Sequence, residues 1–187
     1  MPYGYTGNIL RVDLTTSTIS VEHPNEAFYR RYVGGGAMAA YYILRETPVG
    51  CDPLGPDNTL VFSPTVMVGA PASGMVRFTV AAKSPLTGGF GKAEAGGFWG
   101  PELKFAGYDA IVVKGRSPEP VYIWIHDGEV EFRSAAHLTG KLSDEAEEII
   151  RREVGEPKAR VAQMGPAGEK LVRFAAVVNN LKHFNGR

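Results

Sequence analysis

The sequence predicts an α+β fold that is rich in strands, with a few helices and an internal duplication. Residues 5–22 and 121–133 each alternate apolar and polar side chains about a short turn, which is typical of a hairpin. The second observation is a repeat, because 172–175 (VRFA) resembles 76–79 (VRFT). In each half this segment follows a hairpin, a helix, a short strand and a Gly/Pro turn. The repeat covers about 5–92 and 108–187, which predicts two β-rich halves and a pseudo-two-fold surface.

The amino-terminal part begins with strands on either side of a turn at 15–17. Asn25 can cap a helix that runs through Tyr32. Three glycines at 34–36 interrupt the helical pattern, since each costs a helix interior roughly 1 kcal/mol against alanine. They are either a hinge or a place where backbone meets a neighbour. A second helix is expected over 37–45 and a strand over 59–63.

The stretch 71–109 organises the rest of the chain. An apolar run at 76–82 ends in a turn and then in a loop with six glycines between 88 and 100. Pro101 opens a short helix that Gly107 can close. Glycines this dense require positive φ or close backbone approach. We weigh two interpretations equally: a loop whose amides and neighbouring cations receive phosphate-like oxygens, or a tight surface crossover.

The second half continues with a buried strand at 110–113 and the hairpin at Asp127-Gly128. Ser143 begins a helix with acidic residues in its first turn, and Gly155 ends it. A strand is expected over 160–164.

Composition excludes several classes of protein. The 187 residues carry 20 basic and 20 acidic side chains, so no bulk charge favours nucleic acid. The only cysteine, Cys51, excludes a disulfide framework or an all-cysteine metal site within this chain. The four histidines are scattered without a metal-binding spacing. No apolar run reaches transmembrane length, so we expect a cytoplasmic protein without a membrane partner.

Complete catalytic motifs are missing from the sequence. Gly91-Lys92 is followed by alanine, so no Walker loop is present, and there is neither a nucleophile elbow nor a dinucleotide-binding fingerprint. We therefore expect a base on which a cofactor lies, with the reactive groups supplied elsewhere.

Five segments carry a family resemblance: YGYTGNILRVDLTT, KSPLTG, GGFWGPELKFAGYDAIVVKG, PVYIWI and GPAGEKLVRFAAVVNN. They resemble the amino-terminal domain of the tungsten-dependent aldehyde:ferredoxin oxidoreductase family, over essentially the whole chain. The resemblance implies two sheets related by a pseudo-two-fold, treated as one domain over 1–187. It also implies a base for a tungsten (or molybdenum) bis-pterin cofactor with bound magnesium.

The resemblance further implies domains that this sequence does not contain. In the family these domains supply the cysteines of a [4Fe–4S] cluster, the main pterin-binding segments and the substrate cavity. The chain is expected to be an excised domain or a piece of a split enzyme that oxidises aldehydes to carboxylic acids. Electrons would pass to ferredoxin or another electron-transfer subunit, and the isolated domain is expected to retain cofactor weakly and to dimerise through its exposed face.

Site residues follow from the resemblance position by position. Arg77 matches an arginine that reaches the cofactor. Glu94-Ala95-Gly96-Gly97 matches a loop that meets the pterin phosphates and helps to hold magnesium through backbone carbonyl oxygen. The second cofactor segment contributes His183, Phe184, Gly186 and Arg187, with Phe184 as the second magnesium contact. No catalytic residue is assigned to this chain.

The sequence departs from the family pattern at three places. Glu94-Ala95 replaces a common Asn-Ser, Gly36 stands where many members have arginine, and 182–185 reads KHFN. The Gly-Gly-Phe-Trp form at 96–99 and the missing arginine at Gly36 resemble the branch that includes the benzoyl-coenzyme A reductase tungsten subunit. Glu94 could add a carboxylate to magnesium or repel the phosphates. A non-catalytic scaffold or assembly module that lost the cofactor is the alternative function.

Overall fold

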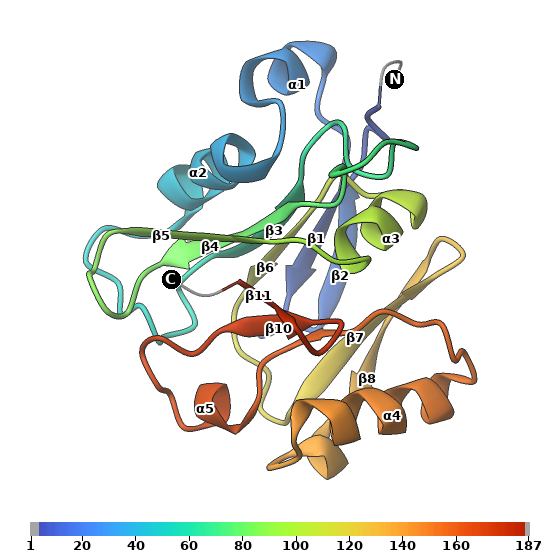
Figure 1. The fold of residues 1–187 in the computed structure, drawn as a ribbon. Helices are drawn as coiled ribbons and strands as arrows, with labels where there is room; N and C mark the ends of the chain where they lie inside the picture. Colours follow the sequence, from blue (N-terminus) through green and yellow to red (C-terminus); the bar gives the residue numbers. More distant parts are fainter. Residues whose placement is uncertain (1–3, 186–187) are drawn as a thin grey trace.

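A computed structural model describes residues 4–185 and shows an α+β fold (Figure 1). Its main sheet has six strands in the order β2-β1-β6-β3-β4-β5. Their bounds are β1 Ile9–Asp13, β2 Thr18–Glu22, β3 Leu60–Pro64, β4 Phe78–Lys83, β5 Phe90–Ala95 and β6 Ala110–Lys114. β1 pairs with β6 in parallel, and the other pairs are antiparallel. The parallel pair joins the beginning of the chain to its second half.

Two smaller sheets complete the strands. One is the hairpin β7–β8, and the other has the order β11-β10-β9. Their bounds are β7 Val121–His126, β8 Glu129–Ser134, β9 Ala162–Gln163, β10 Val177–Asn179 and β11 His183–Asn185. The helices are α1 Glu26–Tyr32, α2 Gly35–Glu46, α3 Trp99–Phe105, α4 Ser143–Val154 and α5 Pro166–Glu169, with a 3-10 turn at Ala136–Leu138.

Alternate residues of the inner strands point to opposite faces of the main sheet, and other elements cover both faces. Figure 1 shows α1 and α2 together on one side and the β7–β8 hairpin with α4 on the other. The first face is covered by a core of Tyr29, Met38 and Tyr42. On the opposite face, Leu10 and Ile111 pack with apolar side chains that include those of β7 and β8. The second layer therefore rests on the face away from α1 and α2.

A buried ion pair fixes the start of the chain to this core. Lys104 donates to the Asp109 carboxylate, and their side chains are 8% and 2% exposed. The same carboxylate accepts from the backbone N–H of Thr6 and of Gly7 at 3.0 and 2.8 Å. Asp109 is thus hydrogen-bonded on both oxygens, which offsets the cost of its burial.

Most local predictions are confirmed. The hairpins form at both predicted turns, and Asp127 and Gly128 both have positive φ. The Asn25 side chain caps α1 by accepting from the Phe28 N–H. Gly107, with φ +95°, follows the end of α3, and Gly155 ends α4.

The glycines at 34–36 belong to a close contact. A Cβ at Gly34 would lie 2.8 Å from the Pro64 carbonyl oxygen, and Gly34 has φ +124°. At Gly35 it would lie 3.1 Å from Cγ2 of Thr65. Of the two interpretations, backbone meeting a neighbour is the one observed.

The glycine-rich loop was predicted wrongly in part, because Phe90–Ala95 forms strand β5. It pairs along the whole of β4, from Phe78↔Ala95 to Lys83↔Phe90. Its exposed residues alternate with Gly91, Ala93 and Ala95. The small size of this second set hides the period of two that a strand requires. The strand expected over 160–164 is also shorter than predicted, since β9 has two residues.

Each half begins its repeat with a hairpin, but α1 and α2 precede β3, β4 and β5 in the first half, whereas α5 separates β9 from β10 and β11 in the second. The repeated segments differ locally, since Phe78 and Thr79 begin β4 whereas Val172–Ala175 lies before β10. The two-fold relation stays a prediction. Among the described residues, no helix combines the length and apolar character that crossing a membrane requires.

Candidate functional site

The predicted loop lies at the end of β5, directly before α3. Ala95 is buried and closes the strand, and Gly96-Gly97 then turns the chain. Gly97 has φ +96°, and a Cβ there would lie 2.2 Å from the Asn179 Oδ1 atom. Only glycine fits this combination of backbone conformation and close approach.

The neighbour of this loop is the turn between β10 and β11. The Phe98 N–H donates to the Asn180 Oδ1 atom at 2.9 Å, which joins residues 82 positions apart. The turn is itself fixed, because the Asn179 side-chain amide donates to the His183 carbonyl oxygen at 3.2 Å. Asn180 has φ +49°, a conformation that asparagine tolerates better than most residues. The structure therefore brings the two predicted cofactor segments together.

Asn179 and Asn180 are residues of the candidate site that sequence reasoning missed. The pair stands in the GPAGEKLVRFAAVVNN segment, just before the predicted His183 contact. Two adjacent asparagines are a turn signal, and this was the available clue. Their partners could not be found from local pattern, because the contacts are long-range.

Three charged side chains, Lys92, Glu94 and Arg77, determine the electrostatics at the end of β5. The Lys92 Nζ atom lies 2.7 Å from the Glu94 carboxylate. The hydrogen bond from Lys92 is the largest influence on the pKa of Glu94 and lowers it. Partial desolvation acts in the opposite direction, but the charges of Lys92 and Arg77 add to the hydrogen bond, so the pKa lies below its ordinary value. Arg77 is exposed just before β4. The Glu94 carboxylate is therefore ionised at neutral pH, and the positive charges of Lys92 and Arg77 balance its negative charge.

Lys92 also lies over Gly36, at the start of α2. A Cβ at Gly36 would lie 2.8 Å from the Lys92 Cδ atom and 3.2 Å from its Nζ atom. The Lys92 side chain thus occupies the space that a side chain at position 36 would take, which fits the presence of glycine there instead of the arginine of many relatives.

The remaining predicted residues lie on β11 or beyond. His183 is half-buried against Gly96, with its Nδ1 atom 3.8 Å from where a Cβ would be. Phe184 is exposed. The buried Asn185 side chain donates to the carbonyl oxygens of Phe78 and Ala93, both at 3.4 Å, so β11 is tied to β4 and β5. The predicted contacts Gly186 and Arg187 lie outside the described residues.

Two buried side-chain oxygens in this region are unsatisfied. Within residues 4–185 no hydrogen-bond partner reaches Oδ1 of Asn179 or Oδ1 of Asn185. Both atoms have less than 1 Å² of accessible surface, so no ligand reaches them in this arrangement. A side-chain cluster of three or more metal-binding groups is absent from the same range. The arrangement offers a glycine cradle, polar atoms and a cation, which suits a polar anionic cofactor.

The fold and the site define an α+β domain in which the glycine turn at 96–97 contacts the turn between β10 and β11. The model of the aldehyde ferredoxin oxidoreductase N-terminal domain matches residues 9–187. The chain belongs to this family.

Relatives of known name agree with this assignment. The tungsten-containing aldehyde ferredoxin oxidoreductases of Thermococcus kodakarensis and Pyrococcus furiosus are each 45% identical over 185 residues, covering 99% of this chain and 31% of theirs. The WOR-like subunit of aliphatic sulfonate oxidoreductase from P. furiosus is 33% identical over 199 residues, covering 98% of this chain and 32% of its own length. The chain thus spans about a third of these relatives.

A solved structure is similar throughout the chain. It is the active-site complex BamBC of benzoyl coenzyme A reductase with 1,5-dienoyl-CoA, with a TM-score of 0.96 and 40% identity. The match covers 100% of this chain and 28% of the other. Similarity thus extends both to the aldehyde oxidoreductases and to the benzoyl-coenzyme A reductase branch.

Proposed function

We propose that this domain is the base that holds a tungsten bis-pterin cofactor in an oxidoreductase. The observation that carries the proposal is the contact of Gly96-Gly97 with the turn at Asn179-Asn180. This contact forms a polar cradle from the loop that the family resemblance assigns to the cofactor and from the turn directly before the second assigned segment, whose His183 also meets Gly97.

Each part of the cradle has a role in the proposal. Backbone N–H groups at 96–97 and the Arg77 guanidinium would receive pterin phosphate oxygens. His183 would bound the other side, and Gly186 and Arg187 are proposed to continue it. Magnesium would be held by the backbone carbonyls of Glu94 and Phe184. When bound, the tungsten cofactor supplies the redox chemistry, and this chain supplies orientation and neutralising charge.

Lys92 is proposed to replace the cation that many relatives have at position 36. Its ammonium group lies beside Gly36 and neutralises Glu94. A carboxylate neutralised in this way repels phosphate less than a free one. This arrangement weakens the argument for a scaffold that lost its cofactor, which rested on Glu94 and on the altered 182–185 segment.

The activity of the whole protein is proposed from its relatives. We infer oxidation of an aldehyde to a carboxylic acid in the cytoplasm. Electrons would leave through a [4Fe–4S] cluster, carried by domains outside this chain, to ferredoxin or another electron-transfer subunit. The relatives' names differ in substrate, so aldehyde is inferred from the four aldehyde ferredoxin oxidoreductases at 45% identity.

The test is metal and pterin analysis of the full-length protein, purified anaerobically from cells grown with tungstate. We expect near-stoichiometric tungsten and pterin in the wild type and a clear loss in Arg77→Gln. Arg45→Gln is the matched control, since Arg45 lies exposed on α2, away from the cradle. If the folded wild-type protein contains no pterin and neither tungsten nor molybdenum, the scaffold alternative is favoured.

A further inference from the structure

Asn185, at the end of β11, is a buried side chain that spans two strands of the main sheet. Only 5% of its surface is exposed. Its amide donates to the carbonyl oxygens of Phe78 on β4 and Ala93 on β5, both at 3.4 Å. The two acceptors lie 107 and 92 positions away along the chain. One side chain therefore joins the last strand of the small sheet β11-β10-β9 to two strands of the main sheet.

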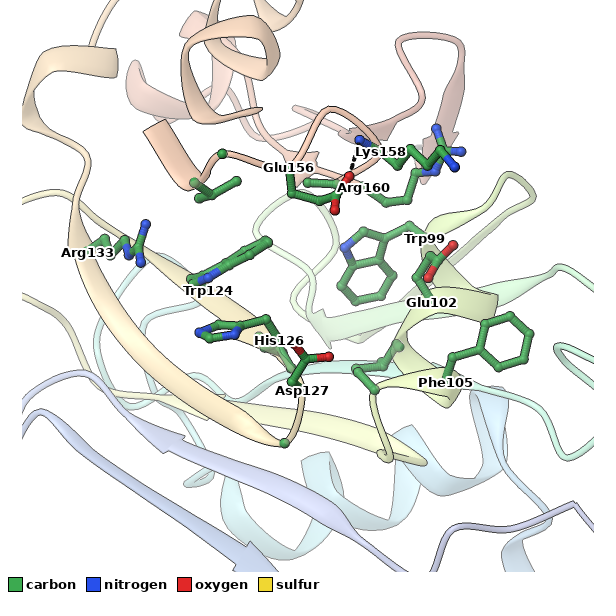
Figure 2. A pocket seen from close by; sticks show the side chains of 17 residues that line it. Trp99, Glu102, Phe105, Trp124, His126, Asp127, Arg133, Glu156, Lys158 and Arg160 are labelled. Carbon is green, nitrogen blue, oxygen red and sulfur yellow. Dashed lines mark hydrogen bonds between the residues drawn. The ribbon is translucent and has the colours of Figure 1, made fainter. Parts of the chain in front are cut away.

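The two acceptors are themselves fixed. The Phe78 side chain is buried and packs against Trp99, with 4.8 Å between the ring centroids. Figure 2 shows Trp99 at the wall of a hollow that Trp99 and Trp124 both line. Ala93 lies within β5, where the strand is paired with β4. The Asn185 amide thus meets two carbonyl groups whose positions the main sheet determines, and through them it fixes the position of β11.

The place of Asn185 matches the proposed cofactor contacts along the chain. One of its two acceptors directly follows Arg77, and the other directly precedes Glu94. Asn185 itself directly follows Phe184. Each of these three proposed contacts is therefore one residue away from a group in this pair of hydrogen bonds. A shift of β11 relative to β4 and β5 would move Phe184 away from Arg77 and Glu94.

Stability alone does not explain an asparagine at this position. Within residues 4–185 its Oδ1 atom is buried and accepts no hydrogen bond. The free-energy cost of such an oxygen offsets what two long hydrogen bonds contribute. An apolar side chain of similar size would avoid this cost. The amide is better explained by the position that it gives to its neighbours.

We propose that Asn185 is a positioning residue of the cofactor site, an inference that rests on the proposed function. By joining β11 to β4 and β5, it sets the separation of the Glu94 and Phe184 carbonyl oxygens that would hold magnesium. It also keeps Arg77 beside them. No contact with the cofactor and no chemical step is assigned to Asn185 itself.

The test compares two asparagine variants of the full-length protein, purified anaerobically from cells grown with tungstate. Asn185→Ala removes the link between β11 and the main sheet. Asn58→Ala is the matched control, because the Asn58 amide donates to the carbonyl oxygens of Pro53 and Lys83 at 2.7 and 3.0 Å. Lys83 is at the opposite end of β4 from Phe78. The control thus loses shorter hydrogen bonds than Asn185→Ala does, but it leaves β11 in place.

The readouts are the release of pterin and magnesium at a temperature at which the wild type loses them over hours, with circular dichroism to follow the fold. We expect Asn185→Ala to release both about 10-fold faster than the wild type while still folded, or to lack both after purification. A factor of ten is about the effect of one lost hydrogen bond. Asn58→Ala should stay within about two-fold of the wild type.

Two outcomes would overturn the inference, and they are distinguishable. Equal release from Asn185→Ala and Asn58→Ala, in a protein whose wild type holds tungsten and pterin, would refute the positioning role alone. A folded wild type without metal or pterin would refute the proposed function and this inference with it. If Asn185→Ala gives no folded protein, the pair Asn185→Ser and Asn58→Ser replaces it. Serine keeps a shorter donor, so a smaller loss selective for position 185 is then expected, and equal release would again refute the role.

Discussion

Replacing Gly97 with alanine tests the contact on which the cradle depends. The new Cβ would lie 2.2 Å from Oδ1 of Asn179, 2.8 Å from Oδ1 of Asn180 and 3.0 Å from Cδ2 of His183. Positive φ alone costs a non-glycine residue about 1–2 kcal/mol. The turn must also move away, which breaks the Phe98–Asn180 hydrogen bond for about 1 kcal/mol more. We expect a loss of about 2–3 kcal/mol in the free energy of unfolding.

The adjacent glycine is a matched control. A Cβ at Gly96 would meet its nearest atom, Cγ2 of Val76, at 3.7 Å, which is an ordinary contact. Gly96→Ala should therefore change stability by less than about 0.5 kcal/mol. Urea denaturation followed by circular dichroism measures the free energy of unfolding of both variants. The midpoint of thermal unfolding of Gly97→Ala should lie about 4–12 °C below that of the wild type. Equal stability of the two variants would refute the proposed close approach.

Three further predictions concern polar contacts. Asn180→Ala removes the acceptor of the Phe98 N–H, so hydrogen exchange of that amide should accelerate, with about 1 kcal/mol of stability lost; unchanged exchange would contradict the contact. Asp109→Asn leaves Lys104 buried without its partner and should cost about 3–5 kcal/mol by urea denaturation, whereas Asp127→Asn in the β7–β8 turn should cost far less. Burial tends to raise the pKa of Glu46, but the two hydrogen bonds from Arg11 at 2.8 and 2.6 Å, the charge of Arg11 and the interaction with Lys114 together outweigh it and lower that pKa. A lowered folded-state pKa means that stability is present above the unfolded pKa of about 4.3 and is lost as pH falls through the folded value. At pH near 7 the free energy of unfolding of the wild type should exceed that of Glu46→Gln by about 1–3 kcal/mol, and this difference should disappear in acid. A difference in stability that does not change with pH would argue against the ion pair.

Sequence pattern predicted the features that depend on neighbouring residues. The turn at Asp127-Gly128, the Asn25 cap and the Gly107 helix end follow from local conformational preference, and the structure has each of them. Strand β5 could not be read in this way, because its inward side chains are too small to show a period of two. It forms because β4 offers a free edge along its whole length.

The sequence by itself determined the α+β class, the short-range turns and caps, and the family motifs on which the proposal of two cofactor segments depends. These depend on spacing along the chain, so a linear pattern contains them. Tertiary structure alone decided that Gly97 meets Asn179, that Lys92 lies over Gly36 and that the two tryptophans line one hollow. The physical reason is that each of these contacts joins residues far apart in the chain. Their approach is fixed by how the sheets and helices pack, and no local preference of either residue specifies it.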